Sequence, residues 1–256
     1  MKAVILAGGL GTRMREETEY KPKPMVEIGG KPVLWHIMKN FAFHGITEFI
    51  ICLGYKGEIV KDYFLNYATR NSNLEVDLLA SSVTPSNPKL PNWKVSLVDT
   101  GAETTTAGRI ILVKDLLEGS NFLCTYGDGL ADVNVSNLID FHESHGKVAT
   151  VTAVQPSSRF GLLEVDDDNS VKSFSEKPIL KDWINGGYFC FSNSVFDYLD
   201  FESPLEVGPL SRISENGQLK AFRHEGFWQP MDTYREYVAL NKMWNDGEAK
   251  WKTWSD

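Results

Sequence analysis

A glycine-rich segment directly follows the first strand-like run of the sequence. The apolar residues 3–6 lead into Ala7-Gly8-Gly9-Leu10-Gly11-Thr12-Arg13. Three glycines in so short a stretch let consecutive backbone N–H groups turn toward one point, and such a nest binds phosphate oxygens. A Walker loop is excluded because no Gly-Lys-Ser/Thr follows, and a dinucleotide fingerprint is excluded because Met14 stands where its third glycine would lie. The alternative is a glycine-rich turn that binds nothing.

A lysine and an aspartate occupy two further positions suited to phosphate chemistry. Lys23 lies ten residues beyond Arg13, and the prolines on either side of it stiffen the backbone that carries its ammonium group. Asp128 follows the very apolar run 122–126 and stands between two glycines. Open α/β sheets bind ligands at the carboxyl ends of their strands, so this carboxylate is a candidate ligand of Mg²⁺. The alternative for Asp128 is an ordinary turn residue.

The combination Gly-Gly-x-Gly-Thr-Arg followed by Pro-Lys-Pro resembles the signature of the nucleotide-sugar pyrophosphorylases, a family of nucleotidyltransferases. The resemblance implies that Arg13 and Lys23 contact the leaving end of a nucleoside triphosphate, where pyrophosphate departs with growing negative charge. It also implies that Asp232, in the segment 228–233, is the second Mg²⁺ ligand beside Asp128. The alternative for Asp232 is the N-cap of the helix that follows.

Three later segments, 159–161, 176–178 and 185–187, resemble the sugar-binding elements of the same family. Lys177 also has a physical argument of its own, because two anionic reactants cannot approach each other without a cation between them. The alternatives are an exposed turn at 176–178 and a hairpin turn at 185–186. The sugar-phosphate contacts that the resemblance implies are Gly161, Glu176, Lys177, Asn185 and Gly186.

Residues 14–18 depart from the Leu-x-Pro-Leu-Thr pattern of many members and resemble the glucose-1-phosphate cytidylyltransferase branch. That branch implies Mg²⁺-dependent transfer of a cytidylyl group from CTP to α-D-glucose 1-phosphate, which yields CDP-glucose and pyrophosphate. CDP-glucose leads to the CDP-linked deoxysugars of bacterial surface polysaccharide. UTP- or dTTP-dependent relatives and a glycosyltransferase that consumes a nucleotide sugar remain alternatives, although residues 99–109 lack the Pro-x-Gly-Leu-Ala-Gln loop typical of a thymidylyltransferase.

The resemblance assigns catalysis to three cations, Arg13, Lys23 and Lys177. Thr104 and Arg109 are carried over as nucleotide contacts, with the alternative that the threonines cap a helix and that the arginine lies on its solvated face. The nucleotide-binding residues implied are Leu6, Ala7, Gly8, Gly9, Leu10, Gly11, Thr12, Arg13, Lys23, Thr104, Arg109 and Gly127.

Short β-rich runs alternate with amphipathic runs along the chain, which predicts βαβ units. The first long helix is predicted over 33–43, with Pro32 at its first turn and Gly45 at its end, and a later helix is predicted over about 107–117. Together with the resemblance, this order predicts a Rossmann-like, three-layer α/β nucleotidyltransferase fold with a mixed, mainly parallel central sheet. We expect one domain over 1–256, with a nucleotide-binding part (1–130) and a part for sugar-phosphate binding and assembly (131–256). The three prolines of residues 81–92 predict a loop or lid there.

Composition excludes several classes of protein. The formal charge is −8, from 26 basic and 34 acidic residues with no basic run, which argues against a nucleic-acid partner. No apolar run approaches the ~20 residues that span a bilayer, so we expect a cytoplasmic protein with no membrane partner. The cysteines lack paired spacing, and His142 and His145 suggest a solvated helix rather than a zinc site. We expect a homo-oligomer, with the C-terminal tryptophans in the core or in subunit contacts.

Overall fold

The computed structural model describes residues 1–9, 11, 14, 19–86 and 90–255. Within them, a seven-stranded sheet runs in the order β14-β10-β13-β8-β1-β4-β7, and four two-stranded pairs lie outside it. The strands are β1 (Lys2–Ala7), β2 (Glu27–Ile28), β3 (Lys31–Pro32), β4 (Glu48–Leu53), β5 (Asn73–Asp77), β6 (Ser82–Ser86), β7 (Lys94–Asp99), β8 (Phe122–Tyr126), β9 (Gly129–Ala131), β10 (Ala149–Val154), β11 (Leu162–Val165), β12 (Val171–Ser175), β13 (Ile184–Phe191), β14 (Leu219–His224) and β15 (Trp228–Pro230).

The helices alternate with these strands along the chain. The α-helices are α2 (Val33–Phe43), α3 (Gly57–Leu65), α4 (Tyr67–Arg70), α5 (Thr106–Leu112), α6 (Val135–His145), α7 (Pro209–Glu215) and α8 (Tyr234–Asn245). The 3-10 helices are η2 (Lys23–Met25), η3 (Lys114–Leu117) and η4 (Asn193–Asp197).

The large sheet is mixed and mainly parallel, as predicted. β1 pairs in parallel with both β4 and β8, β4 with β7, and β10 with β14, whereas β13 runs antiparallel to β8 and β10. The two neighbours of β1, the strands β4 and β8, come from different parts of the sequence. β1 therefore lies at a switch point in the strand order. Such a point opens a crevice at the carboxyl ends of the strands.

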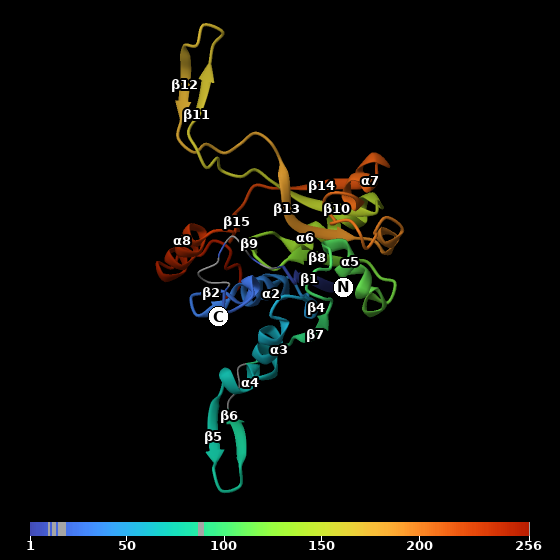
Figure 1. Cartoon of the computed structure of the whole chain (residues 1–256), viewed down its shortest axis with the longest axis vertical. Helices are drawn as coiled ribbons and strands as arrows, with labels where there is room; N and C mark the ends of the chain where they lie inside the picture. Colours follow the sequence, from blue (N-terminus) through green and yellow to red (C-terminus); the bar gives the residue numbers. More distant parts are fainter. Residues whose placement is uncertain (10, 12–13, 15–18, 87–89, 256) are drawn as a thin grey trace.

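Helices cover both faces of the sheet and make the fold three layers thick (Figure 1). Alternate residues of β1 show the division, since Ala3 and Ile5 pack with α2, α3, α6 and α8 on one face. Val4 and Leu6 pack with α5, η3, η4 and α7 on the other face. This alternation follows from the two-residue period of side chains along a strand. The structure thus has the predicted three-layer α/β architecture.

The limits of α2 follow local sequence signals, as predicted. α2 begins after Pro32, which has the φ of −57° that proline imposes, and Gly45 follows its end with a φ of 82°. Glycine adopts that left-handed conformation without strain, and Gly45 N–H donates to the carbonyl of Ala42 at 3.0 Å. The predicted helix over about 107–117 is instead divided at Val113 into α5 and η3.

The predicted loop over residues 81–92 is wrong for 82–86, which form β6. This strand pairs antiparallel with β5, with Pro85 opposite Leu74. A two-stranded ribbon has open edges, so a proline that lacks an N–H donor is tolerated when it faces outward. The β5–β6 hairpin and the β11–β12 hairpin project from opposite ends of the molecule (Figure 1). Residues 87–89 of the predicted loop lie outside the described residues.

The structure corrects the prediction for His142 and agrees with the prediction that the cysteines are unpaired. His142 is 2% exposed, so the solvated helix predicted for it is wrong, and its Nδ1 lies 2.9 Å from Thr150 Oγ1. The face of α6 that carries Val135, Leu138 and His142 is buried because the helix is amphipathic. All three cysteines are buried and unpaired, as core thiols are. Trp251 and Trp254 belong to the core. Among the described helices, none is long and apolar enough to cross a membrane.

Candidate active site

The glycine loop and the Gly127-Asp128 segment leave the sheet side by side. β1 and β8 are adjacent parallel strands with Leu6 in register with Tyr126. The chain therefore emerges from both strands at the same edge of the sheet, and Gly127 N–H donates to the Leu6 carbonyl at 3.0 Å. Sequence reasoning placed both segments at strand ends, but only the strand order makes these two strands neighbours.

Two very short strands bring the two aspartates together. β9 begins directly after Asp128, and β15 ends two residues before Asp232. β9 and β15 pair antiparallel with Gly129 opposite Pro230, and Met231 N–H donates to the Asp128 carbonyl at 2.9 Å. This register carries Asp232, about a hundred residues away in sequence, to the side of Asp128.

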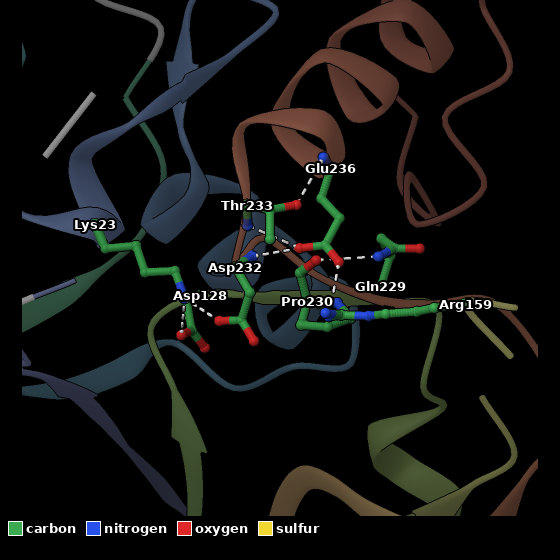
Figure 2. Close-up of polar contacts among 8 residues, drawn as sticks. All are labelled: Lys23, Asp128, Arg159, Gln229, Pro230, Asp232, Thr233 and Glu236. Atoms are coloured by element: carbon green, nitrogen blue, oxygen red, sulfur yellow. Dashed lines mark hydrogen bonds and ion pairs between the residues drawn. The ribbon is translucent and has the colours of Figure 1, made fainter. Parts of the chain in front are cut away.

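Lys23 bridges the two carboxylates. Its Nζ lies 2.6 Å from Asp128 Oδ2 and 2.5 Å from Asp232 Oδ1 (Figure 2). Lys23 is 9% exposed overall, and the side chains of Asp128 and Asp232 are 33% and 18% exposed. η2 fixes its backbone, because Pro22 precedes it and Val26 N–H returns to its carbonyl at 3.1 Å. Both contacts are charge-assisted hydrogen bonds between ionised groups.

A capping box at the start of α8 fixes the backbone of Asp232. Thr233 is the N-cap, so the alternative that Asp232 caps this helix is wrong. Glu236 Oε2 accepts hydrogen bonds from Asp232 N–H at 2.7 Å and Thr233 N–H at 2.9 Å, while Glu236 N–H donates to Thr233 Oγ1. Arg159 Nη2 lies 3.3 Å from the other Glu236 oxygen (Figure 2). The sequence carries this signal in Thr-x-x-Glu.

A cavity of about 600 Å³ joins these parts into one site. Both aspartates and most of the residues predicted to bind nucleotide line it. Leu10, Thr12 and Arg13, which were predicted to bind nucleotide, lie outside the described residues. The predicted residues that line this nucleotide-side cavity are Leu6, Ala7, Gly8, Gly9, Gly11, Lys23, Thr104, Arg109, Gly127, Asp128 and Asp232.

Arg109 holds the walls of the cavity together. It is 4% exposed, so the alternative that it lies on a solvated helix face is wrong. Its Nη1 donates to the Leu53 and Gly101 carbonyls and to Thr100 Oγ1 at 2.6–3.0 Å, and its Nη2 donates to the Gly8 and Ala102 carbonyls at 3.2 Å. Burial lowers the pKa of this guanidinium.

The packing around Arg109 explains the first glycine of the loop. A Cβ atom on Gly8 would lie 2.1 Å from Arg109 Nη1, so only glycine fits against the guanidinium. Arg109 therefore ties the start of the glycine loop to the ends of two neighbouring strands, which holds the loop at a fixed position in the cavity wall.

The three consecutive threonines, Thr104, Thr105 and Thr106, make different contacts. Thr104 Oγ1 donates to the Thr100 carbonyl, and Thr105 is the N-cap of α5, accepting from Gly108 N–H at 3.0 Å. Thr106 Oγ1 donates to Glu206 Oε2 at 3.0 Å and accepts from Leu205 N–H. The capping alternative is thus correct for Thr105, while Thr104 and Thr106 line the cavity.

Glu206 and Tyr126 are residues that sequence reasoning missed at this site. The Tyr126 hydroxyl donates to Glu206 Oε1, and Tyr126 lines the cavity. Burial, followed by the charge of Glu206, raises the pKa of the Tyr126 phenol. Glu206 comes from the segment before α7, and no local pattern marks it, because only the fold brings that segment to α5.

The residues predicted to bind the sugar phosphate form two groups. Gly161, Glu176 and Lys177 lie at the base of the β11–β12 hairpin, where Ser158 N–H donates to the Pro178 carbonyl at 2.8 Å. Lys177 Nζ lies 3.2 Å from Glu176 Oε1, and both side chains are largely exposed. None of these three is among the described residues that line the nucleotide-side cavity. Arg159 connects this base to Glu236 on α8.

Asn185 and Gly186 lie nearer the aspartates, within strand β13. The hairpin-turn alternative for them is therefore wrong. The Gly186 carbonyl accepts from Trp228 Nε1 at 2.7 Å, and Trp228 belongs to β15, the strand that leads to Asp232. Asn185 Oδ1 accepts from Gly187 N–H at 2.8 Å. This group is adjacent to the strand that positions one of the two carboxylates.

A phosphate-type glycine loop, a buried lysine and paired carboxylates at a strand switch point define a nucleotidyltransferase site. Residues 2–246 match the family model described as "Nucleotidyl transferase", and the chain belongs to this family. A solved structure of HddC from Yersinia pseudotuberculosis has a similar fold, with a TM-score of 0.70, 26% identity, and coverage of 95% of this chain and 99% of that one.

Two curated relatives are considerably closer in sequence. The glucose-1-phosphate cytidylyltransferase of Salmonella typhi is 50% identical over 257 residues, covering 99% of this chain and 100% of the relative. The probable glucose-1-phosphate cytidylyltransferase of Bacillus subtilis (strain 168) is 48% identical over 257 residues, with the same coverage of both chains. This chain is therefore similar to both relatives over almost its whole length.

Proposed function

We propose that this chain transfers a cytidylyl group from CTP to α-D-glucose 1-phosphate, forming CDP-glucose and pyrophosphate. The observation that carries the proposal is the single cavity in which the glycine loop, Lys23, Asp128 and Asp232 meet. The full-length similarity to two relatives named as cytidylyltransferases of this sugar phosphate supports the choice of both substrates.

In the proposed reaction, an oxygen of the sugar phosphate attacks the α-phosphorus of CTP in line. The bond from that phosphorus to the oxygen bridging to the β-phosphate breaks, and pyrophosphate leaves with the bonding electron pair. No covalent enzyme intermediate is needed, so the protein acts by positioning the reactants and neutralising charge. Gly8, Gly9 and Gly11 offer backbone N–H groups to the phosphates, and Arg13 and Lys23 offer positive charge to the pyrophosphate end.

The donor set of the site fits Mg²⁺. In the described part of the chain, no three His, Cys, Asp or Glu side chains cluster as a metal cage. Asp128 and Asp232 nevertheless converge on one ammonium, and Mg²⁺ is commonly held by one or two carboxylates together with phosphate oxygens and water. We propose that these two residues hold Mg²⁺, which when bound neutralises charge on the reacting phosphates.

Lys177 and Glu176 are proposed to receive the sugar phosphate from the hairpin base, with Gly161, Asn185 and Gly186 contacting the hexose. The exposure of Lys177 leaves its ammonium accessible to an anionic substrate. The division into a nucleotide part (1–130) and a sugar part (131–256) and the cytoplasmic location stay predictions. Asp232, a residue of the second part, lines the nucleotide-side cavity, so under this proposal both parts contribute to the reaction centre.

Product analysis tests the proposal directly. The protein is incubated with Mg²⁺, glucose 1-phosphate and equal concentrations of CTP, UTP and dTTP, and the products are identified by mass spectrometry. CDP-glucose and pyrophosphate should dominate. Equal or greater yields of UDP-glucose or dTDP-glucose would show a different base specificity, and release of a nucleoside diphosphate from a nucleotide sugar would indicate a glycosyltransferase.

We further propose that the chain forms a homo-oligomer. The two projecting hairpins carry exposed apolar side chains, among them Leu78 and Leu79 at 87% and 98% exposure and Phe174 at 64%. Exposed apolar groups gathered on projecting segments are typical of surfaces that another chain covers. Light scattering on the purified protein should give a mass that is a multiple of 28.8 kDa, and a monomer mass would contradict the proposal.

A further inference from the structure

Lys23 holds the two carboxylates that are proposed to bind the metal. Its ammonium contacts one oxygen of each aspartate at 2.6 and 2.5 Å, in a largely buried position. Two adjacent carboxylates repel each other, and the ammonium between them offsets that repulsion and the cost of removing them from water. The ammonium therefore occupies the position that a divalent cation bound to both carboxylates would need.

The same lysine is proposed to contact the triphosphate, and it cannot serve both anions from one position. Its backbone is fixed in η2 between Pro22 and Pro24, so any change must come from its side chain. That side chain is a compact charge on a flexible four-carbon stem, which can reorient without moving the backbone. Arg109, by contrast, is fixed by donors to five oxygen atoms.

We propose that Lys23 is an internal counter-cation that competes with the divalent metal for Asp128 and Asp232 and is released to the triphosphate when the metal binds. This inference rests on the proposed function. The two carboxylates and the ammonium together carry one negative charge, whereas the carboxylates alone carry two. The free enzyme should therefore bind a divalent cation weakly, and nucleotide should strengthen metal binding by giving the ammonium another partner.

Direct binding of Mn²⁺ to the full-length protein without nucleotide tests this competition, with free Mn²⁺ measured by electron paramagnetic resonance. Lys23→Met should lower the dissociation constant on the order of tenfold or more, because it removes a positive charge in contact with both carboxylates. Lys23→Gln gives a second, polar variant for the same comparison. Circular dichroism of each variant verifies that it is folded.

Two matched controls separate competition from a general charge effect. Lys21→Met removes the same charge two residues earlier, from a side chain that lines a different cavity, and should leave Mn²⁺ affinity near the wild-type value. Lys23→Arg keeps the charge and should also bind Mn²⁺ weakly. A lysine with a merely structural role would lower affinity when replaced, instead of raising it.

The outcomes distinguish this inference from the proposed function. The competition is supported if Lys23→Met binds Mn²⁺ more tightly than wild type and if adding Asp128→Asn to that variant abolishes the binding. The metal then lies at the proposed carboxylates. If Lys23→Met and Lys23→Gln bind Mn²⁺ no more tightly than wild type while Asp128→Asn still weakens binding, the competition is overturned and the metal site stands. If Asp128→Asn and Asp232→Asn leave Mn²⁺ binding unchanged, both proposals fail.

Discussion

Lys23 and Arg109 are buried cations of the same cavity, and their partners give them different roles. Arg109 donates to neutral carbonyl and hydroxyl oxygens of the protein. A planar guanidinium with five donors suits such bridging, whereas a lysine ammonium is a point charge that can change partners. Lys23 faces two carboxylates, so we assign Arg109 to positioning the loop and Lys23 to the charge chemistry.

Substitution of Asp128 and Asp232 tests the proposed metal site. Asp128→Asn and Asp232→Asn keep the size of the side chain but remove its charge. We expect kcat to fall on the order of 100-fold or more, the range for losing one preorganised charge-stabilising group. The measurement is pyrophosphate release at saturating substrates over a range of Mg²⁺ concentrations. Asp62→Asn, exposed on α3 and paired with Arg70, should keep the wild-type kcat. Near-normal turnover in both site variants would contradict the assignment.

Replacing Lys177 and replacing Lys23 should affect the use of different substrates. Lys177→Ala should raise the KM for glucose 1-phosphate about tenfold or more, since a hydrogen bond to a charged group contributes ~1.5–3 kcal/mol. Lys23→Ala should instead impair the use of CTP. Full saturation curves for both substrates check this, with Lys181→Ala as the exposed neighbouring control. A Lys177→Ala enzyme that is impaired only in CTP saturation would reverse the assignment.

At the scale of elements, the smallest ones position the chemistry. β9 and β15 are three residues each, yet their pairing places Asp128 beside Asp232. η2 is also three residues long and fixes the backbone of Lys23. Such short elements have little stability of their own and depend on the packed core around them. The capping box of α8 adds the local bonds that hold Asp232 in place.

That capping box carries a prediction about both stability and metal use. Glu236→Ala removes the acceptor for the N–H groups of Asp232 and Thr233, so the free energy of unfolding should fall by ~1–2 kcal/mol. The Mg²⁺ concentration for half-maximal turnover should also rise, because the Asp232 carboxylate loses its fixed position. Urea unfolding and Mg²⁺ titration measure the two effects. Glu236→Gln keeps an acceptor oxygen, so it should have most of the wild-type stability and a Mg²⁺ requirement close to that of the wild type. An unchanged Mg²⁺ requirement in Glu236→Ala would contradict the role.

At the scale of the whole molecule, two buried neutral histidines make the fold sensitive to acid. His36 is 1% exposed, with Nε2 2.9 Å from the Ile28 carbonyl and Nδ1 accepting from Trp251 Nε1. Burial lowers the pKa of His36 to about 4 from the ordinary 6.5. Burial, with the charge of His145 second, likewise lowers the pKa of His142 to about 4. Both side chains therefore lie in the core as neutral rings at pH 7.

The unfolded chain binds protons at these histidines from about pH 6.5 downward, whereas the folded chain binds them only near pH 4. Stability is thus unaffected above pH 6.5 and falls as the pH drops from 6.5 to 4. For His36 the loss should reach ~2 kcal/mol at pH 5, from 1.36 kcal/mol per pKa unit. Urea unfolding at pH 7 and pH 5 measures it. His36→Gln should reduce this pH-dependent loss, whatever its effect at pH 7. An undiminished loss in that variant would contradict the prediction.

Features that depend only on neighbouring residues could be predicted from the sequence. Side-chain periodicity predicted the order of strands and helices, and the proline and glycine at its two ends predicted the limits of α2. The glycine loop, Lys23 between two prolines, and Asp128 after an apolar strand were also visible, because each is a local arrangement of a few residues. Resemblance to a known family added Asp232, which has no distinguishing local pattern apart from the threonine that follows it.

Contacts between residues that are distant in the sequence are set by the fold. The pairing of β9 with β15 joins Asp128 to Asp232, and the packing of α5 against the sheet buries Arg109, although its helix gave no sign of which face would be buried. Glu206 reaches Tyr126 for the same reason. β6 was missed because a proline argues against a central strand, and only pairing with β5 reveals an open ribbon in which proline is tolerated. Local pattern sets which elements form, but the burial of apolar faces against one another sets which side chains meet.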